Sequence, residues 1–518
     1  MLRVLLVLLV LAVPARAQDA FTTALAGLSG NFTAQAEAVE RLGALGDPRA
    51  LPILQALGEG RLLKRADGVL LLRQGEALRE ALSGGASTEA GEVLRINNRV
   101  RGALRGAFGR LQLLSPVEAE RLAAADGLFR SRSAENVAML EDALGREASA
   151  RVRPVMELAL AASRLAAGED SAKRQGIILL GGSSSPEARA VLLEARAANA
   201  GLAAEIDQAV AAIDRRLQLK RAAETAFQGL SLGSILLLAA LGLAVTFGVM
   251  GVINMAHGEM VMLGAYTTVV VQEALRGIPA LAPLSLPLSV PAAFLVTAAV
   301  GVALERGLIR HLYGRPLETL LMTFGVGMIL QQSVRLIFGA QNREVVSPAW
   351  MQGTLQLPGG IEVTQNRLWI IFFSLVVLGL TVAAIRFTRF GLEMRAVVQN
   401  RRIAATMGIR TGRVDAMTFA FGSGIAGIAG VAVSQIDNVS PNLGTGYIID
   451  SFMVVVFGGV GSLAGTMIGA LTLGIVNKML EPWAGAVLAK IAVLVGIMLF
   501  IQRRPKGLFA LKGRAAEQ

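Results

Sequence analysis

Apolar residues are distributed unevenly along this chain of 518 residues. From Asp19 they recur at helical spacing among many charged residues, whereas from Phe227 onward they form long runs with little charge. Runs of about 17–25 apolar residues are long enough to cross a bilayer as helices. The pattern predicts a helical domain outside the membrane at 18–225, a membrane domain at 226–510 and a short tail at 511–518.

Nine apolar segments in the second part qualify as candidate membrane spans. The seventh is short and bounded by glycine, which is as typical of a re-entrant segment as of a crossing, so eight or nine spans are predicted. The candidate spans are 229–250, 256–272, 288–309, 317–338, 368–387, 414–435, 448–460, 465–480 and 484–501.

Cations in the loops predict which side of the membrane each loop occupies. Loops 306–316 and 386–413 and the C-terminal tail are rich in Arg or Lys, and such loops usually stay in the cytoplasm. Loops 339–367 and 436–447 hold few cations and are expected to face outward. Counting back through the spans places residue 228, and the domain before it, on the outer side.

The first 17 residues predict a secretory signal peptide. Arg3 gives a positive start, 4–13 form a short apolar core, and Ala15-Arg16-Ala17 is a small-x-small cleavage site. An uncleaved anchor is the alternative, but the core is short for a span. The signal peptide supports an extracytoplasmic position for 18–225 despite the cations at 215–221, because long translocated domains override such charges.

Paired helices are predicted to recur in the first domain. Asp47-Pro48 and Ser185-Pro186 each combine an N-cap residue with proline at the first helical position, and an apolar stripe follows each pair. No alternating strand pattern stands out, so the chain is predicted to be all-α. Helix pairs of this kind resemble HEAT repeats, which stack into an α-solenoid. A plain helical bundle that acts as a spacer is the alternative.

Composition limits the chemistry of the chain. It has no cysteine, which excludes disulfides, thiol catalysis and zinc–thiolate sites, and its two histidines exclude a multi-histidine metal site. No Walker A motif is present, so any ATP hydrolysis must come from another subunit. The lack of an acid–base constellation argues against an enzyme. Many of the cations flank apolar spans, which indicates membrane topology rather than nucleic-acid binding.

Three motifs follow one another in the membrane domain: GVMGVINMAHGE at 248–259, a cationic stretch at 391–409, and FGGVGSLAGT at 457–466. Together they resemble the branched-chain amino-acid permease family of ABC importers, over about 227–510. Within that family, a signal peptide followed by a helical domain of this size resembles the urea-importer permease, the first of two permease subunits.

The resemblance implies a polytopic helical permease in a bacterial inner membrane, most consistent with urea as cargo. It implies four kinds of partner: a second permease subunit, two ATPase subunits that hydrolyse ATP, an extracytoplasmic binding protein and membrane lipid. The chain itself is expected to hold no cofactor. Import of branched-chain amino acids or another small amide is the alternative in the same class. A membrane-anchored ligand sensor is the alternative from another class.

Polar residues inside the spans are candidates for the translocation path or gate, because such groups are costly in a bilayer and usually functional. The structural alternative is that Asn254 caps a helix starting at Met255 and Glu259 complements its positive end. The glutamines can equally bond a neighbouring helix. The candidates are Asn254, His257, Glu259, Gln331 and Gln332.

Two further sets of residues have predicted roles. The resemblance places an ATPase-coupling helix at Arg395–Ile409, and an interfacial helix on anionic headgroups is the alternative. Its members are Arg395, Ala396, Asn400, Ala404, Gly408 and Ile409. Gly461, Gly465 and Gly469 are spaced by four residues, which predicts a small-residue face for close helix packing.

Overall fold

The computed structural model describes residues 20–509 except 76, 88–90, 167–168, 279 and 358–359. The predicted signal peptide at 1–17 and tail at 511–518 lie outside the described residues. The chain divides into two compact units, Met1–Gln218 and Leu219–Gln518, whereas the predicted boundary lies at 225.

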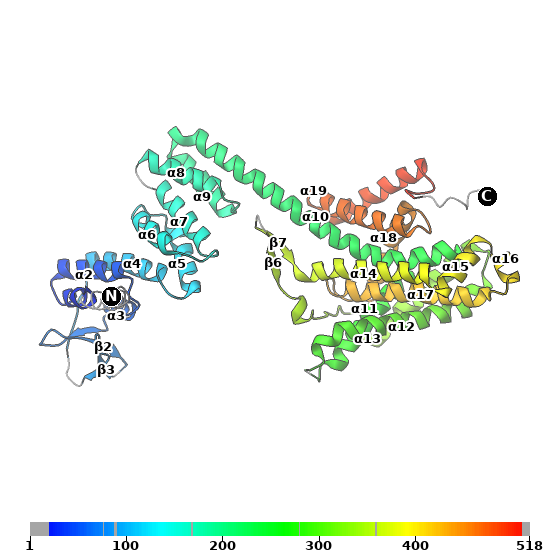
Figure 1. Ribbon diagram of the computed structural model, residues 1–518, viewed down its shortest axis with the longest axis horizontal. Coiled ribbons are helices and arrows are strands. Elements are labelled where there is room, and N and C mark those ends of the chain that lie inside the picture. Colours follow the sequence, from blue (N-terminus) through cyan, green and yellow to red (C-terminus); the bar gives the residue numbers. More distant parts are fainter. Residues whose placement is uncertain are drawn as a thin grey trace, which may run out of the picture. The chain divides into compact units, whose positions relative to one another are not determined.

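Unit 1 consists mainly of short helices packed on their sequence neighbours (Figure 1). At the start of α9, the Ser185 hydroxyl accepts hydrogen bonds from the N–H groups of Glu187 and Ala188, which confirms the predicted cap. Helix α3 starts later than predicted, because Asp47 Oδ1 accepts from the N–H of Arg49 at 2.9 Å and holds a turn before it. The helices are α2 (Phe32–Leu45), α3 (Ala50–Gly58), α4 (Asn98–Leu113), α5 (Glu118–Ser131), α6 (Asn136–Arg146), α7 (Arg153–Leu165), α8 (Asp170–Gly181), α9 (Pro186–Ala198) and α10 (Ala203–Met250), which continues into unit 2.

A five-stranded antiparallel sheet in unit 1 contradicts the all-α prediction. Its order is β4-β3-β2-β1-β5. Gly68 has φ +89°, and Asp67-Gly68 turns the chain between β1 and β2, a combination favoured in hairpins. Leu62 and Leu70 then pack into the core formed with α2, α3 and α4. The strands are β1 (Leu62–Lys64), β2 (Leu70–Gln74), β3 (Ala77–Glu80), β4 (Ala86–Ser87) and β5 (Glu92–Val93).

Unit 2 is a helical bundle in which α11 and α12 both pack along α17 (Figure 1). A short hairpin, β6 (Thr354–Leu357) and β7 (Ile361–Thr364), precedes α14 and is a second departure from an all-α chain. The helices after α10 are α11 (His257–Leu275), α12 (Ser285–Gly307), α13 (Pro316–Phe338), α14 (Gln365–Phe387), α15 (Arg389–Gln399), α16 (Arg401–Thr406), α17 (Thr411–Val433), α18 (Leu443–Gly458) and α19 (Leu463–Arg503).

Six helices of the described chain are long and apolar enough to cross a membrane: α10, α12, α13, α14, α17 and α19. The candidate span at 448–460 corresponds to the shorter α18. The candidates at 465–480 and 484–501 both fall in α19, which is interrupted at Gly485 (φ 77°, ψ 161°). A total of eight or nine crossings therefore stays a prediction.

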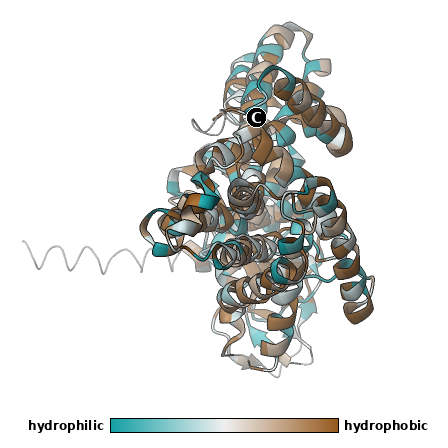
Figure 2. Ribbon diagram, turned by 90° about the vertical axis from the view of Figure 1, so that its right-hand side faces the viewer, coloured by the Kyte–Doolittle hydropathy of each residue, from teal (hydrophilic) through white to brown (hydrophobic). Residues whose placement is uncertain are grey.

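Several of these helices carry large apolar residues that are exposed in the chain alone. Hydrophobic residues are brown on the ribbon of Figure 2. Leu336 on α13 is 86% exposed and Phe387 at the end of α14 is 80% exposed. By contrast, α10, α11 and α17 are buried in the middle of the unit. Exposed apolar surface of this kind is stable when lipid or another membrane subunit covers it.

Glycine permits close backbone contact inside the bundle. A Cβ atom on Gly264 of α11 would collide with the carbonyl oxygen of Gly427 on α17. Gly465 and Gly469 of α19 lie against α18 in the same way, at Gly458 and Val454.

Gly461 departs from the predicted small-residue face. It lies before α19, has φ +83° and approaches Gly248 rather than α18. The Ser462 hydroxyl accepts from the N–H of Gly465 at 3.1 Å and starts the helix only after Gly461.

Candidate functional site

Helix α13 touches the rest of unit 2 along one narrow face. Thr319, Thr323 and Gly327 are buried at intervals of four residues, which places them on one side of the helix. Leu321 and Ile329 on other sides are 71% and 66% exposed. The first three turns of the contact face are thus small and polar, and the apolar Val334 continues it toward the end of the helix, whereas the free faces are apolar.

The chain between α10 and α11 runs past this face. Helix α11 starts at His257 rather than at Met255, because Asn254 Oδ1 accepts from the N–H of Ala256 at 3.0 Å and forms a turn. The N–H of Met255 donates to Thr323 Oγ1 on α13 at 3.1 Å. Asn254 is 1% exposed, and its Nδ2 has no hydrogen-bond partner among the described residues.

Glu259 lies one turn of α13 further along. A Cβ atom on Gly327 would be 3.5 Å from Glu259 Cγ, in ordinary van der Waals contact, so Gly327 lies directly beside the glutamate stem. Glu259 is 8% exposed, and its Oε2 is buried without a hydrogen-bond partner in the described chain. A buried polar atom of this kind is costly unless something bonds it.

Gln331 extends the same face to the segment before α18. Its Nε2 donates to Asn442 Oδ1 at 2.8 Å, and Arg335 Nη2 donates to the same oxygen at 3.1 Å. Thr323, Gly327 and Gln331 therefore face, in order, the chain at Met255, Glu259 and Asn442. We call the side chains of Asn254, Glu259, Thr323, Gln331 and Asn442 the polar track.

Two predicted path residues lie outside the polar track. His257 is fully buried on the side facing α10, where its Nε2 is 2.8 Å from the carbonyl oxygen of Ala239. Gly242 makes room for this ring, since a Cβ there would be 2.8 Å from His257 Cε1. Gln332 is exposed, and as the residue after Gln331 it points about 100° away around the helix.

The predicted coupling helix is two helices in the structure. The chain between α15 and α16 breaks at Asn400, whose side chain accepts from the N–H of Ile403 at 3.0 Å and caps α16. Arg395 donates to the carbonyl oxygen of Ile385 at 2.7 Å, which fastens α15 to the end of α14. The amphipathic pattern continues across Asn400 and did not predict this break.

The α15–α16 segment has one face in the core and one face free. Met394, Val397 and Ala404 are buried together with Val245 of α10 and Val414 of α17, and Ala396 and Ile409 pack at the edge of this group. Gly408 has φ +87° and ends the segment. On the free face, the apolar side chains of Ile403 and Met407 are 60% and 78% exposed.

An ion pair that the sequence did not reveal holds α16 to α17. The Arg401 guanidinium bonds both carboxylate oxygens of Asp415, which is 1% exposed, and its Nη1–Oδ1 distance is 3.2 Å. The same guanidinium lies over the ring of Tyr313, 4.7 Å from its centre. Burial raises the pKa of the Tyr313 hydroxyl. Tyr313 and Asp415 are distant in sequence, so only the fold reveals this cluster.

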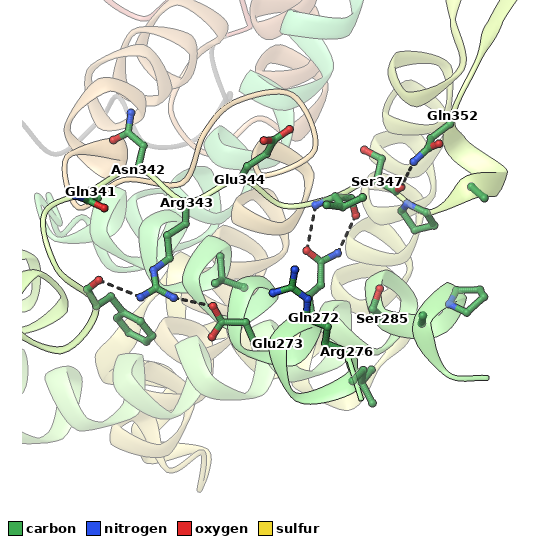
Figure 3. A pocket seen from close by; sticks show the side chains of 18 residues that line it. Gln272, Glu273, Arg276, Ser285, Gln341, Asn342, Arg343, Glu344, Ser347 and Gln352 are labelled. Carbon is green, nitrogen blue, oxygen red and sulfur yellow. Dashed lines mark hydrogen bonds and ion pairs between the residues drawn. The ribbon is translucent and has the colours of Figure 1, made fainter. Parts of the chain in front are cut away.

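A large cavity lies at the end of the unit that is predicted to face outward. Its volume is about 760 Å³, and the end of α11, the start of α12 and loop 339–352 line it. Figure 3 shows how two side chains hold this loop. Arg343 donates to Glu273 Oε1 at 2.7 Å, and Gln272 exchanges hydrogen bonds with the backbone of Val346 at 2.8 and 3.0 Å.

The loop also joins the segment before α18. The N–H of Arg343 donates to the carbonyl oxygen of Val439 at 2.8 Å, and the N–H of Val439 donates back at 2.9 Å. Loops 339–352 and 434–442 are thereby paired beside Asn442, at one end of the polar track.

The second unit matches a known protein family. The family model "Branched-chain amino acid transport system / permease component" matches residues 225–502. The high-affinity branched-chain amino acid transport system permease protein LivH of Salmonella typhimurium is 32% identical over 292 residues, which cover 54% of this chain and 93% of the relative.

Two further relatives are similar to part of the chain. The corresponding permease protein BraD of Pseudomonas aeruginosa is 29% identical over 289 residues, again 54% of this chain and 93% of the relative. The ribose import permease protein RbsC of Escherichia coli is 32% identical over 101 residues, 18% of this chain and 32% of that protein. No solved structure matches the chain significantly.

Proposed function

We propose that urea is the cargo of this chain, which belongs to the branched-chain amino acid permease family of ABC transporters and is thus a membrane transport subunit. The observation that carries this proposal is the polar track. Asn254 Nδ2 is a buried donor without a partner and Glu259 Oε2 a buried acceptor without one, in the described chain.

Urea complements such groups well. It is small and uncharged, and it carries both N–H donors and a carbonyl acceptor. Amide, hydroxyl and carboxylate side chains can exchange hydrogen bonds with it one after another. Glu259 is the only carboxylate of the track, and the remaining members are amides and a hydroxyl.

Branched-chain amino acids are the second candidate cargo. The names of the relatives LivH and BraD point to these substrates. In addition, Arg335 bonds Asn442 at one end of the track and Glu259 lies along it, so charges of both signs are near. A zwitterion requires such compensation when it leaves water.

The free face of α15–α16 supports a role in coupling to ATPase subunits. Ile403 and Met407 are exposed apolar residues, and the exposed Arg402 and Arg410 lie close to them in the sequence. An apolar centre with a charged rim is typical of a protein interface. The proposed assembly contains a second permease, two ATPases and an extracytoplasmic binding protein, with lipid or the second permease on the exposed faces of α13, α14 and α19.

The predicted topology belongs to the same proposal. Unit 1 and the loops at 339–367 lie outside the cytoplasm, and loop 386–413 with the C-terminus lies inside. The cationic loops support this orientation. The proposal also includes a cleaved signal peptide at 1–17 and stacked helix pairs in the N-terminal domain.

The first test is uptake of labelled urea at micromolar concentration by cells with and without this gene, with excess leucine as competitor. Loss of urea uptake on deletion, with no effect of leucine on the intact strain, is expected. Normal urea uptake together with lost leucine uptake would instead assign the chain to amino-acid import.

A further inference from the structure

We propose that a small chamber beside the start of α18 is an acceptance site for an uncharged amide solute, which it binds before the solute enters the polar track. This inference rests on the proposed function. The chamber has a volume of about 330 Å³ and lies apart from the larger cavity of Figure 3, although Asn342 lines both.

Four asparagines from separate parts of the chain line this chamber. They come from loop 339–352, the segment before α18 and α19, and they are Asn342, Asn438, Asn442 and Asn477. The side chains of Asn342, Asn438 and Asn477 form no hydrogen bond within the described chain. Each free amide offers two N–H donors and one carbonyl acceptor. Together they can bond both the carbonyl and the amino groups of a planar amide.

The charges around the chamber largely balance one another. Lys490 Nζ is 3.1 Å from Asp450 Oδ2, so these two charges largely compensate each other. Asp437 is exposed and has no ion-pair partner among the described residues, and Arg335, which bonds the lining residue Asn442, supplies a positive charge nearby. A free carboxylate repels the carboxylate of an amino acid but attracts its ammonium group, so the preference for urea rests on the free asparagine amides.

Asn442 connects the chamber to the polar track. It lines the chamber, and its Oδ1 accepts from Gln331 Nε2 of α13. A solute that replaces this hydrogen bond passes from the asparagines of the chamber to Gln331 and then toward Glu259. The chamber therefore supplies a first set of partners at the point where the solute loses water.

The test measures the concentration dependence of labelled urea uptake by the complete transporter in cells. The variants Asn438→Leu and Asn477→Leu remove one free amide each. An increase of the KM for urea of about fivefold, with a nearly unchanged maximal rate, is expected, because a polar solute loses one hydrogen-bonding partner in the site. The matched control is Asn366→Leu at the start of α14, which lies outside the chamber.

Immunoblots of membranes normalise the rates for the amount of each variant. Asn438 is exposed in a loop, so its replacement tests the chamber even if Asn477→Leu fails to accumulate. Acetamide and formamide are expected to compete with urea in the intact transporter, and leucine is not.

Failure of the chamber's role and failure of the proposed function give different results in this experiment. If the intact transporter imports urea and both variants keep its KM, the chamber is not the acceptance site and the proposed function stands. If the intact transporter imports no urea, the proposed function and the chamber's role both fall.

Discussion

The two ends of unit 2 hold their helices together in different ways. At the end predicted to face outward, α13 meets the segment before α18 through the amide pair Gln331–Asn442. At the opposite end, α16 meets α17 through the Arg401–Asp415 ion pair, stacked on Tyr313. Amide hydrogen bonds contribute little net energy and exchange readily with a solute. A buried ion pair is strongly unfavourable to break on one side, so it keeps its two helices together.

Arg401→Ala is expected to have the largest effect on this comparison. It leaves the buried Asp415 without its partner, and because the Arg401 side chain is 45% exposed, the cost is below the about 3–5 kcal/mol of a fully buried pair broken on one side. Helix α16 should then detach, uptake should be lost, and limited proteolysis of membranes should cleave between 389 and 410. Arg402→Ala, at the neighbouring exposed position, is the control. Equal protease resistance of both variants would show that the pair does not hold α16.

Gly327→Leu is expected to reduce urea uptake by at least about tenfold, because the added side chain occupies the space next to Glu259. A Cβ atom on Gly325 of the same helix would meet no other atom within 4 Å, so Gly325→Leu serves as the control. Uptake rates normalised for membrane content distinguish the two. Similar rates for both variants would argue that no solute passes this point of α13.

Gln331→Leu is expected to change uptake by only a few fold, because it removes one amide hydrogen bond worth about 1 kcal/mol. Gln332→Leu should have a smaller effect, since that side chain lies outside the polar track. The comparison uses initial rates of urea uptake at low concentration. A larger loss for Gln332→Leu would place the path on the other side of α13.

The smallest effect is expected for an ion pair outside the membrane. In unit 1, the hydrogen bond from Arg121 lowers the pKa of Glu147. Its stabilisation is therefore present above the unfolded pKa of about 4.3 and is lost as the pH falls through the folded pKa. The thermal midpoint of unit 1 should fall more steeply below about pH 5 in the natural protein than in Glu147→Gln. Parallel curves would contradict this.

Sequence patterns predicted the features that depend only on interactions between residues close together in the chain. The cap at Ser185 and the long apolar helices follow from neighbouring residues alone. The sheet at 62–93 was missed because its leucine run suits a helix or a strand equally, and the turn at Asp67-Gly68 decides between them. The break at Asn400 was missed because an amphipathic pattern continues across it.

Contacts between distant residues could not be predicted. The sequence singles out Gln331 but does not indicate that Asn442 receives its hydrogen bond. Lys490 similarly finds Asp450 on another helix. For His257 the sequence identified a polar residue inside the membrane, yet only the structure shows that it faces α10 instead of α13.

The glycine contact between α11 and α17 limits how this protein can move. Gly264 and Gly427 bring the two backbones together with no side chain between them, and Gly430 meets α11 further along in the same way. Sliding or tilting one helix against the other would drive backbone into backbone. The two helices are therefore expected to move together as one rigid pair whenever the membrane domain changes shape.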